Sequence, residues 1–435
     1  MGKRGGSGGR ALNTTVEETA ALADWSALLL PEGTRLVHVG PHKTGTTSLQ
    51  SAFHAKRVEA SEHGVHYTGP TRQPVASVLA VTGRRNPTTG EPSAPRDWQA
   101  LVREARRAKE PRVVISSEFF ADAPPEAVAT VVRDLDPVHI VVTLRPLARI
   151  IPSQWQQYVQ SGMRVSFDAW LDAMLNKPDS KLTPTFWMRH RHDRLVARWA
   201  EAAGPGNVTV VALDDRDHSM VVRVFEGLTG LREGTLSADI DRTNRSMTMP
   251  EIEVVRAFNK LFRAEGLANP LHTKVMRFGA ASYMKTRDPE LGEPRIETPQ
   301  WALDRAGEIA REMVDSIVAS GVRIVGDIER MTVVPRSGLS GDRQPTITIP
   351  ADIAAATTMG ILISSGLARG TSKTLAPTAD DETRAAPKPS VFQPRPTTEP
   401  LELVRVPTIQ LAAVLLRRTR ATFAERAHRA LRRFR

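Results

Sequence analysis

The chain of 435 residues contains no cysteine, so it has no disulfide framework, no thiol nucleophile and no cysteine-ligated metal site. It also lacks any run of about eighteen or more apolar residues, the length that a membrane-spanning helix requires. Residues 1–10 are rich in glycine and basic side chains and do not contain the apolar segment of a secretory signal. No internal repeat is present. Together these absences favour a cytoplasmic globular protein.

The net charge of +11 is concentrated at the two ends of the chain. Residues 1–10 carry three basic side chains and no acidic one, and residues 401–435 carry nine arginines against two glutamates. The remaining residues are therefore close to neutral. A nucleic-acid-binding domain concentrates basic side chains on its own surface. We therefore expect basic arms on an ordinary enzyme and no nucleic-acid partner.

Composition divides the chain into four parts. We expect an N-terminal tail with a lead-in helix over 16–30 (residues 1–33), an α/β domain (34–335), a linker rich in Pro, Thr and Ser (336–400) and a basic amphipathic helix (401–435). The linker cannot bury enough apolar surface to fold and is expected to be mostly disordered, except for a short helix over 353–367.

Short apolar runs alternate with helical patterns over 34–335. Strands are expected at 36–39, 113–115, 139–144 and 207–213, and helices near 46–56, 75–81, 98–109, 125–135, 152–161, 164–203, 220–228, 251–263 and 301–330. This alternation predicts a P-loop-like parallel sheet flanked by helices, in a single domain. Ligands bind beyond the carboxyl ends of such strands. Lys43, Glu118 and Arg145 each follow a strand, so we expect them to converge.

A turn rich in hydroxyl groups joins the first strand to the next helix. It contains Gly40, His42, Lys43 and Gly45, and its hydroxyl side chains are those of Thr44, Thr46, Thr47 and Ser48. Free N–H groups and the positive end of the helix dipole attract an anion at a helix N-terminus, and Lys43 adds a full charge. The turn is therefore predicted to be a phosphate-binding loop.

The position of the lysine narrows the kind of anion. A nucleoside-triphosphate loop places Lys and then Ser or Thr directly after its second glycine. Here Thr46 and Thr47 follow Gly45, and Lys43 is inside the loop, where it lies over the outer end of a shorter anion. A P-loop kinase or NTPase stays open as an alternative, with the Ser-Ser-Glu segment 116–118 holding Mg²⁺.

A second pair of residues follows the third predicted strand. Arg145 leaves that strand, and Ser153 lies eight residues later. A guanidinium gives a bidentate charge and a hydroxyl gives a directed donor, so the pair can hold one phosphate. We place the start of the next helix at Pro152, because proline is tolerated in a first turn. A start at Leu147 would displace Ser153 from this role.

The segment Pro-His-Lys-Thr-Gly-Thr-Thr-Ser-Leu at 41–49 resembles the 5′-phosphosulfate loop of sulfotransferases that use 3′-phosphoadenosine 5′-phosphosulfate (PAPS). Arg145 with Ser153 is similar to their 3′-phosphate site. The resemblance covers roughly residues 34–330 and is to the bacterial type, which also resembles the carbohydrate sulfotransferases. A looser similarity at 241–246 adds Asn244 and Arg245 as nucleotide contacts. The resemblance implies a catalytic domain that uses PAPS as co-substrate and no metal.

The resemblance also implies the chemistry. A sulfuryl group passes from PAPS to a hydroxyl or amine of an acceptor, and Lys43 stabilises the charge that develops on the bridging oxygen. The family uses either a His or a Glu as base. Glu118 at a strand end is our first choice, unless it only holds Lys43 or Arg145. His42 is the second choice, unless it is a turn residue. The remaining histidines considered are expected on the surface or in loops: His63, His66, His190 and His192.

The acceptor cannot be deduced from a motif. A small-molecule or glycan acceptor is expected, with a carbohydrate or glycolipid hydroxyl preferred, in part because a basic helix can bring the enzyme to a membrane. The acceptor pocket is expected in the loops 66–96 and 160–195, whose tryptophans suit sugar rings, although core packing is the favoured use of most of them. The basic helix Leu411–Phe434 can lie on an anionic membrane, here the inner membrane surface, or bind a partner. A third hypothesis is therefore a non-catalytic docking protein that uses this helix on a degenerate α/β scaffold.

Overall fold

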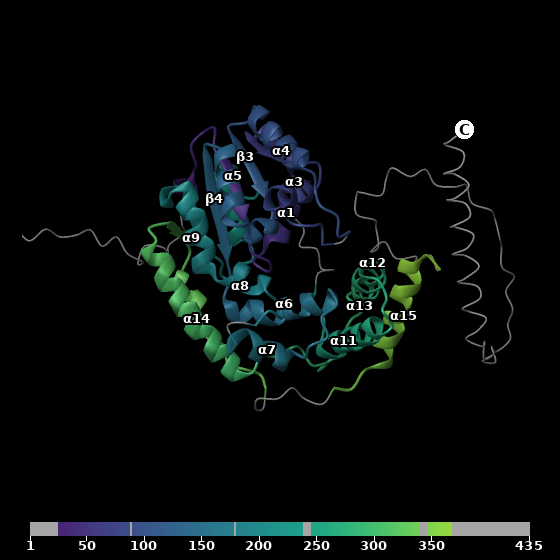
Figure 1. Cartoon of the computed structure of the whole chain (residues 1–435). Coiled ribbons are helices and arrows are strands. Elements are labelled where there is room, and N and C mark those ends of the chain that lie inside the picture. Colours follow the sequence, from purple (N-terminus) through teal and green to yellow (C-terminus); the bar gives the residue numbers. More distant parts are fainter. Residues whose placement is uncertain (1–24, 88, 178–179, 238–244, 340–346, 368–435) are drawn as a thin grey trace, which may run out of the picture. The chain divides into compact units, whose positions relative to one another are not determined.

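In the computed structural model of the chain, one sheet of six parallel strands forms the centre of the fold (Figure 1). Its strands are β1 Arg35–Val39, β2 Val65–Tyr67, β3 Arg112–Ser116, β4 Val138–Leu144, β5 Val208–Ala212 and β6 Arg323–Val325. The structure describes residues 25–87, 89–177, 180–237, 245–339 and 347–367, all within one compact unit. The predicted fold class, a parallel sheet flanked by helices, is confirmed.

The strand order places β1 at a topological switch point. The order is β2-β3-β1-β4-β5-β6, so the chain builds one side of the sheet after β1 and then crosses to the other. His38 near the end of β1 is aligned with Ser116 of β3 and Val141 of β4. A crevice at the carboxyl end of the strands opens where the order reverses. The loop that follows β1 therefore begins at the position where an open α/β sheet binds its ligand.

Helices cover both faces of the sheet because successive strand residues point to opposite sides. Leu36 packs with helices α1 Thr46–Ala55, α2 Arg57–Glu62 and α10 Met220–Thr229. Val37 and Val39 pack with helices α3 Val75–Thr82, α4 Pro95–Arg107, α5 Pro125–Asp134 and α9 His192–Ala203. The 3₁₀ segments are η1 Trp25–Leu28, η2 Glu118–Asp122, η3 Pro205–Asn207 and η5 Ile328–Thr332.

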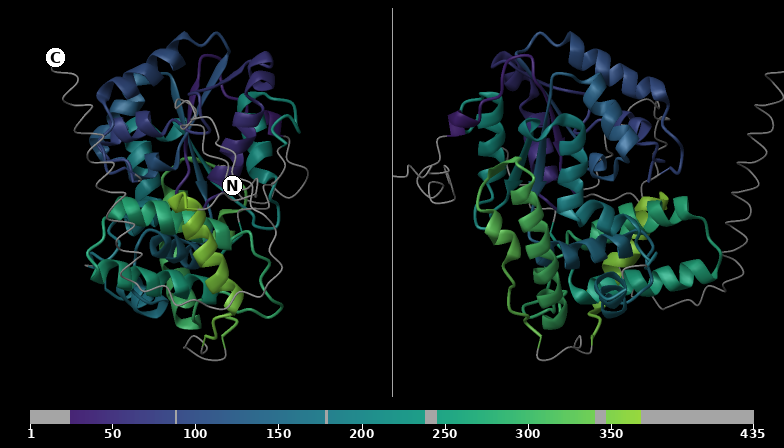
Figure 2. Two further views of the ribbon diagram at one scale, coloured as in Figure 1. Left: turned by 90° about the vertical axis from the view of Figure 1, so that its right-hand side faces the viewer. Right: turned by 60° about the vertical axis from the view of Figure 1, so that its left-hand side comes forward.

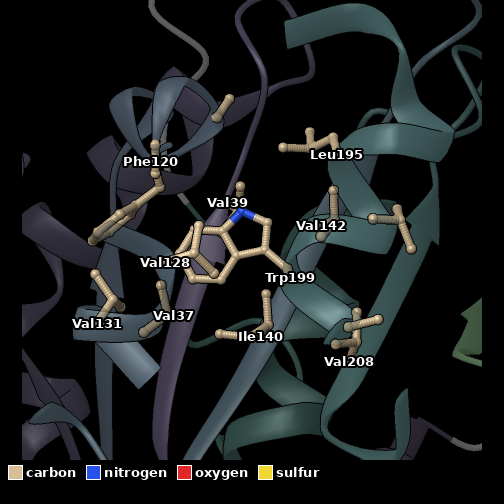
Figure 3. Close-up of a cluster of buried hydrophobic side chains, with 14 of the residues drawn as sticks. Val37, Val39, Phe120, Val128, Val131, Ile140, Val142, Leu195, Trp199 and Val208 are labelled. Atoms are coloured by element: carbon tan, nitrogen blue, oxygen red, sulfur yellow. The ribbon is translucent and has the colours of Figure 1, made fainter. Parts of the chain in front are cut away.

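Trp199 of α9 lies at the centre of the larger core (Figure 3). Its indole is fully buried and meets the ring of Phe120 edge-on, with ring centroids 6.0 Å apart. Phe120 belongs to η2, which begins directly after β3. The core therefore holds in place the short segment that starts with Glu118.

A helical half extends from the carboxyl ends of the strands (Figure 1). It contains α6 Leu147–Gln160, α7 Phe167–Leu175, α8 Thr185–His190, α11 Met249–Ala264, α12 Asn269–His272, the π-helix η4 Thr273–Ala280, α13 Ala281–Met284, α14 Gln300–Ala319 and α15 Ala351–Ser365. All of these helices except α12 contribute to a second core around Trp155 and Trp170. Because α6 begins just after the end of β4, this half lies on the side of the sheet that carries the candidate site.

Helix α15 shows that the folded part continues beyond residue 335. Ile353 is fully buried in the second core, and Gly360 lies so close to η4 that a Cβ there would be 2.6 Å from the Cα of Ala280. Figure 2 shows α15, in yellow-green, against the green helices of this half. The expected short helix at 353–367 therefore exists, but it is an integral part of the domain. The expected boundary at 335 is too early, because composition does not reveal packing.

Three further expectations differ from the structure. Strands β2 and β6 were not expected; both are edge strands of three residues, too short to give a periodic pattern. Helix α6 begins at Leu147 and not at Pro152. Within the range expected for the lead-in helix, 16–30, the described residues form the 3₁₀ turn η1 Trp25–Leu28. Residues 1–24, the linker after 367 and the basic helix 401–435 lie outside the described residues. Among the described helices, none is long and apolar enough to cross a membrane.

Candidate functional site

The loop between β1 and α1 has an unusual backbone. Lys43 has φ 74°, and it is the non-glycine residue with positive φ in the described part of the chain. Gly45 also has positive φ, at 77°. A Cβ on Gly40 would lie 2.4 Å from Thr46 Oγ1 and 2.9 Å from His38 Nε2, so this position requires glycine. A positive φ at lysine costs free energy and persists at sites where the conformation itself is needed.

The N-terminus of α1 is open toward this loop. Its N-cap is Gly45, which has no side chain to bond the free N–H groups. Helix α11, in contrast, closes its N-terminus with a capping box between Thr248 and Glu251. Thr46 Oγ1 is buried and has no hydrogen-bond partner within the described part of the chain, whereas Thr47 and Ser48 are exposed. The helix start therefore presents backbone and hydroxyl donors that the protein itself does not use.

A buried chain of hydrogen bonds fixes the loop to the sheet. His38 of β1 contacts Ser116 Oγ through Nδ1 at 2.8 Å and Thr143 Oγ1 through Nε2 at 3.0 Å. Thr143 Oγ1 lies 3.0 Å from Thr44 Oγ1, which donates to the Pro41 carbonyl at 2.8 Å. Thr44 is fully buried, so its side chain holds the loop. Its expected role as a direct ligand contact is therefore not supported.

The order of donors and acceptors in this series of hydrogen bonds assigns the tautomer of His38. Thr44 spends its only proton on the carbonyl, so Thr143 must donate to Thr44, and His38 must donate to Thr143 from Nε2. Its Nδ1 then accepts from Ser116, which in turn accepts from Gln50 Nε2 at 3.3 Å. Burial lowers the pKa of His38 to about 3, which keeps the ring neutral as this arrangement requires. His38 thus positions the loop and does not exchange protons near neutral pH.

Lys43 lies among other positive charges. Burial among protein atoms, followed by the charges of Lys285, Arg277 and Arg145, lowers the pKa of Lys43 to about 8. Glu118 acts in the opposite direction and raises it. The side chain is still accessible to solvent. The loop therefore carries a cation that a bound anion would stabilise in its charged form.

The two candidate bases, Glu118 and His42, both interact electrostatically with Lys43. Glu118 is the first residue of η2, is half-buried, and its charge acts on both Lys43 and Arg277. His42 is 8% exposed, and its Nε2 has no hydrogen-bond partner. Burial and then the charge of Arg189 lower the pKa of His42 well below its ordinary value. The loop therefore carries a buried imidazole whose Nε2 has no partner among the described residues, and a half-buried carboxylate lies close enough to act on Lys43.

A buried ion pair supports this side of the site. Arg189 of α8 donates to both oxygens of Asp122 in η2, at 2.6 and 2.7 Å. The carboxylate is fully buried and the guanidinium nearly so. The pair joins the segment that begins with Glu118 to the helical half. It fixes the orientation of η2 relative to α8.

Arg145 is bound to a carboxylate at the end of the next strand. Its Nε donates to Asp215 Oδ1 at 2.6 Å, and Arg149 Nε lies 3.6 Å from the other oxygen of that carboxylate. Asp215 follows β5, and Arg145 follows β4. Two arginines therefore converge on one anionic group at the carboxyl edge of the sheet.

Helix α6 begins at Leu147, the start that was expected to displace Ser153 from the phosphate, so the position of Ser153 has to be judged from its neighbours in the helix. Pro152 lies inside the helix, where it removes the N–H that would bond Ala148, and Ser153 Oγ donates to the Ile150 carbonyl at 3.1 Å. Ser153 follows Arg149 by four residues, so the two side chains share a face. Ser153 is therefore on the side where Arg149 meets Asp215, and its role in binding stays a prediction.

Arg245 is occupied elsewhere. It donates to both carboxylate oxygens of Glu251 at 2.8 and 2.6 Å, and its remaining donors bond the carbonyls of Met284, Arg287 and Ser246. This network braces α11 against the end of α13. The expected role of Arg245 as a nucleotide contact is not supported. Asn244 lies outside the described residues.

Two cations that the sequence did not single out lie near Lys43. They are Arg277 in η4 and Lys285 at the end of α13, and both lower the pKa of Lys43. Their only sequence signal is a spacing of eight residues, which places both on one side of a helix. His190 and His192 are buried, so their expected surface positions are wrong. His63 and His66 are not buried.

The alternative magnesium site receives little support. Ser116 Oγ bonds His38, and Ser117 caps η2 through Phe119 N and donates to Gln73 Oε1 at 3.2 Å. Both hydroxyls are thus used within the protein. Among the described residues, no group of three or more His, Asp or Glu side chains is placed to hold a metal ion.

Comparison with known proteins gives little guidance. No family model matches the chain, and no curated protein matches it. Among solved structures, the chain is similar to a sulfotransferase from Alicyclobacillus acidocaldarius, with 17% sequence identity and a TM-score of 0.35. The match covers 58% of this chain and 96% of that one. A TM-score this low does not establish a shared fold.

Proposed function

We propose that this protein is a sulfotransferase that moves a sulfuryl group from PAPS to a hydroxyl or amine of an acceptor, preferably a carbohydrate or glycolipid. The observation that carries the proposal is Lys43, held at positive φ inside a loop that leads into an uncapped helix. Such a loop suits a short anion whose outer end meets the lysine. The resemblance of residues 41–49 to a phosphosulfate loop supports a phosphosulfate as that anion.

The residues present fit the two charged ends of PAPS. At the 5′ end, the N–H groups of α1, the unpartnered Thr46 hydroxyl and Lys43 supply donors and charge. At the 3′ end, Arg145 and Arg149 supply the charge that a phosphate requires, with Ser153 on the same helix face as Arg149. The two groups of donors follow neighbouring strands, β1 and β4.

The transfer step needs a cation and a base. The acceptor oxygen forms a bond to sulfur while the bond between sulfur and the bridging oxygen of the nucleotide breaks, and the electron pair stays on that oxygen. Lys43 stabilises the resulting charge. The acceptor proton passes to Glu118, whose charge acts on Lys43 across the site. His42 is the second choice, because its depressed pKa makes it a weak base.

The other two hypotheses lack a supporting observation. The kinase or NTPase hypothesis relies on the strand end 116–118 to hold Mg²⁺, and two of its three side chains, Ser116 and Ser117, are already hydrogen-bonded within the protein. A degenerate scaffold would have no reason to keep Lys43 in a costly backbone conformation. The basic helix on which the docking hypothesis depends lies outside the described residues.

The deciding experiment is label transfer from ³⁵S-PAPS with EDTA present, on a panel of sugars and glycolipids. Incorporation that continues without metal supports the proposal. Binding of 3′-phosphoadenosine 5′-phosphate (PAP), the product nucleotide, is measured in parallel by calorimetry. A protein that binds ATP with Mg²⁺ and ignores PAP would refute the proposal.

The lowered pKa of Lys43 predicts a pH dependence of PAP affinity. Below about pH 7 Lys43 is already charged in the free protein, so its protonation adds no pH dependence to the PAP affinity. Above pH 8 the free lysine is neutral, and binding an anion must recharge it, so affinity falls by up to about tenfold per pH unit. Calorimetry at pH 8.5 in buffers of different ionisation enthalpy should detect proton uptake. Lys43→Arg should remove both effects, and an unchanged profile in that variant would contradict the assignment.

Asp215 and the 3′-phosphate of the nucleotide compete for the same two arginines, Arg145 and Arg149. The Asp215 carboxylate occupies both of them, so a 3′-phosphate must displace it. We expect Asp215→Asn to bind PAP about tenfold more tightly, because the competing charge is gone. Asp214→Asn, which loosens the neighbouring pairs with Arg216 and Arg330, is the matched control and should change little. Weaker PAP binding in Asp215→Asn would mean that this carboxylate orients Arg145 and does not compete.

A further inference from the structure

Arg277 and Lys285 belong to one continuous helical segment. Arg277 lies in η4, which passes directly into α13, and Lys285 follows the last residue of α13. Both side chains are half-buried. Among the described residues, neither forms a hydrogen bond or an ion pair through its side chain; Arg277 has only a contact with the Phe278 ring, at 5.4 Å. Partly buried cations are usually paired, so two unpaired ones on a single segment require an explanation.

The π-helical winding of η4 aligns the two cations. A π-helix is wound more loosely than an α-helix, so the four residues from Arg277 to Ala281 make slightly less than one turn. The next four, through α13, make slightly more than one turn. The deviations offset each other, and Arg277 and Lys285 lie on the same face about two turns apart. The opposite contact of this segment, through Gly279, is with α15.

The charges on this face act on the loop between β1 and α1. Arg277 acts on His42 and Lys43, and Glu118 acts on Arg277. Lys285 acts on Lys43 as well, and burial followed by Arg245 and Arg277 lowers its own pKa. Arg145, which serves the nucleotide, comes instead from the end of β4. An acceptor hydroxyl placed at Glu118 is therefore within the electrostatic reach of Arg277.

We propose that Arg277 and Lys285 form a second anion-binding subsite, which holds a carboxylate, sulfate or phosphate group of the acceptor itself. The acceptor is then an acidic sugar or glycan whose reacting hydroxyl reaches Glu118 while its anionic group lies on the η4–α13 face. This inference rests on the proposed function, and it restricts the substrate class to acceptors that already carry a negative charge.

The test uses the full-length protein saturated with PAP, so that the nucleotide site is filled. Methyl glucuronide, glucose 6-phosphate and glucose 6-sulfate are titrated by calorimetry, with methyl glucoside as the neutral reference. At least one anionic sugar should bind tenfold or more tightly than the neutral one, and the best of the three identifies the anionic group. Arg277→Gln and Lys285→Gln should each reduce that preference about tenfold, as expected for one charged hydrogen bond. PAP affinity should change less than threefold.

Lys274→Gln is the matched control, since it removes an exposed charge from the same helix. It should leave the preference intact, and Arg277→Lys should retain part of it. Equal binding of neutral and anionic sugars by the wild-type protein overturns the proposal. A tenfold loss of PAP affinity in Arg277→Gln also overturns it, because the cations would then serve the nucleotide while the sulfotransferase function stands. A wild-type protein that does not bind PAP refutes the proposed function and this inference with it.

Discussion

Lys43→Ala is expected to reduce sulfuryl transfer from PAPS by about 10³-fold, because the developing charge on the departing nucleotide loses its cation. The fold should persist. Alanine has a Cβ like lysine, so the strain at φ 74° is unchanged, and no ion pair is lost among the described residues. Initial rates with ³⁵S-PAPS and thermal unfolding measure the two effects separately. Activity within tenfold of the wild type would exclude Lys43 from the chemistry.

Lys43→Gly separates the backbone from the charge at the same position. Glycine adopts positive φ without cost, so this variant should be about 1 kcal/mol more stable than Lys43→Ala, after allowance for its larger entropy in the unfolded chain. It should be equally inactive. Equal stability of the two variants would mean that the loop relaxes to another conformation when lysine is absent.

Arg189→Met is expected to lower the free energy of unfolding by about 3–5 kcal/mol, because it leaves the buried Asp122 carboxylate without its bidentate partner. The cations that remain near that carboxylate are Arg84, with its Nε at 3.6 Å, and Arg198, which forms no ion pair with it in the described part of the chain. The double variant Asp122→Leu, Arg189→Met should recover most of the loss, since it removes both charges. Urea unfolding of the wild type, of Arg189→Met and of the double variant measures these free energies.

Arg305→Met is the control for this experiment. Arg305 forms an exposed pair with Glu308 on α14, and such pairs contribute less than about 1 kcal/mol. Equal losses of unfolding free energy in Arg189→Met and Arg305→Met would show that the buried pair of Arg189 and Asp122 contributes no more stability than an exposed pair. Because η2 begins with Glu118, we also expect Arg189→Met to slow transfer more than it weakens PAP binding.

Local signals were sufficient for the centre of the fold. β1, its loop and α1 were predicted to within one residue because an apolar run, a glycine turn and a helix start are adjacent in sequence. β4 and α5 were predicted equally well. In each case the neighbours along the chain determine the structure, and tertiary packing only confirms it.

Features that depend on the partner of a side chain were not predictable. Thr44 and Arg245 have the right chemistry for a ligand, yet Pro41, Thr143 and Glu251 engage them. The start of α6 was misjudged because Pro152 is tolerated inside a helix whose apolar face packs in the second core. Arg277 lies far from Lys43 in sequence and carries no motif, so only the folding of η4 brings it to the loop.

Helix α15 determines where the protein can be shortened. It follows a stretch, residues 336–350, that has no long apolar run, so a boundary chosen from composition would fall near residue 335. Such a truncated protein would lose Ile353 from the second core and uncover the glycine-lined side of η4. The face of that segment that carries Arg277 would lose its support, and an apolar surface prone to aggregation would be exposed. A shortened protein for crystallisation, or one in which the C-terminal tail is replaced, should therefore keep the chain at least to Leu367. This residue follows Gly366, the αL glycine that ends α15.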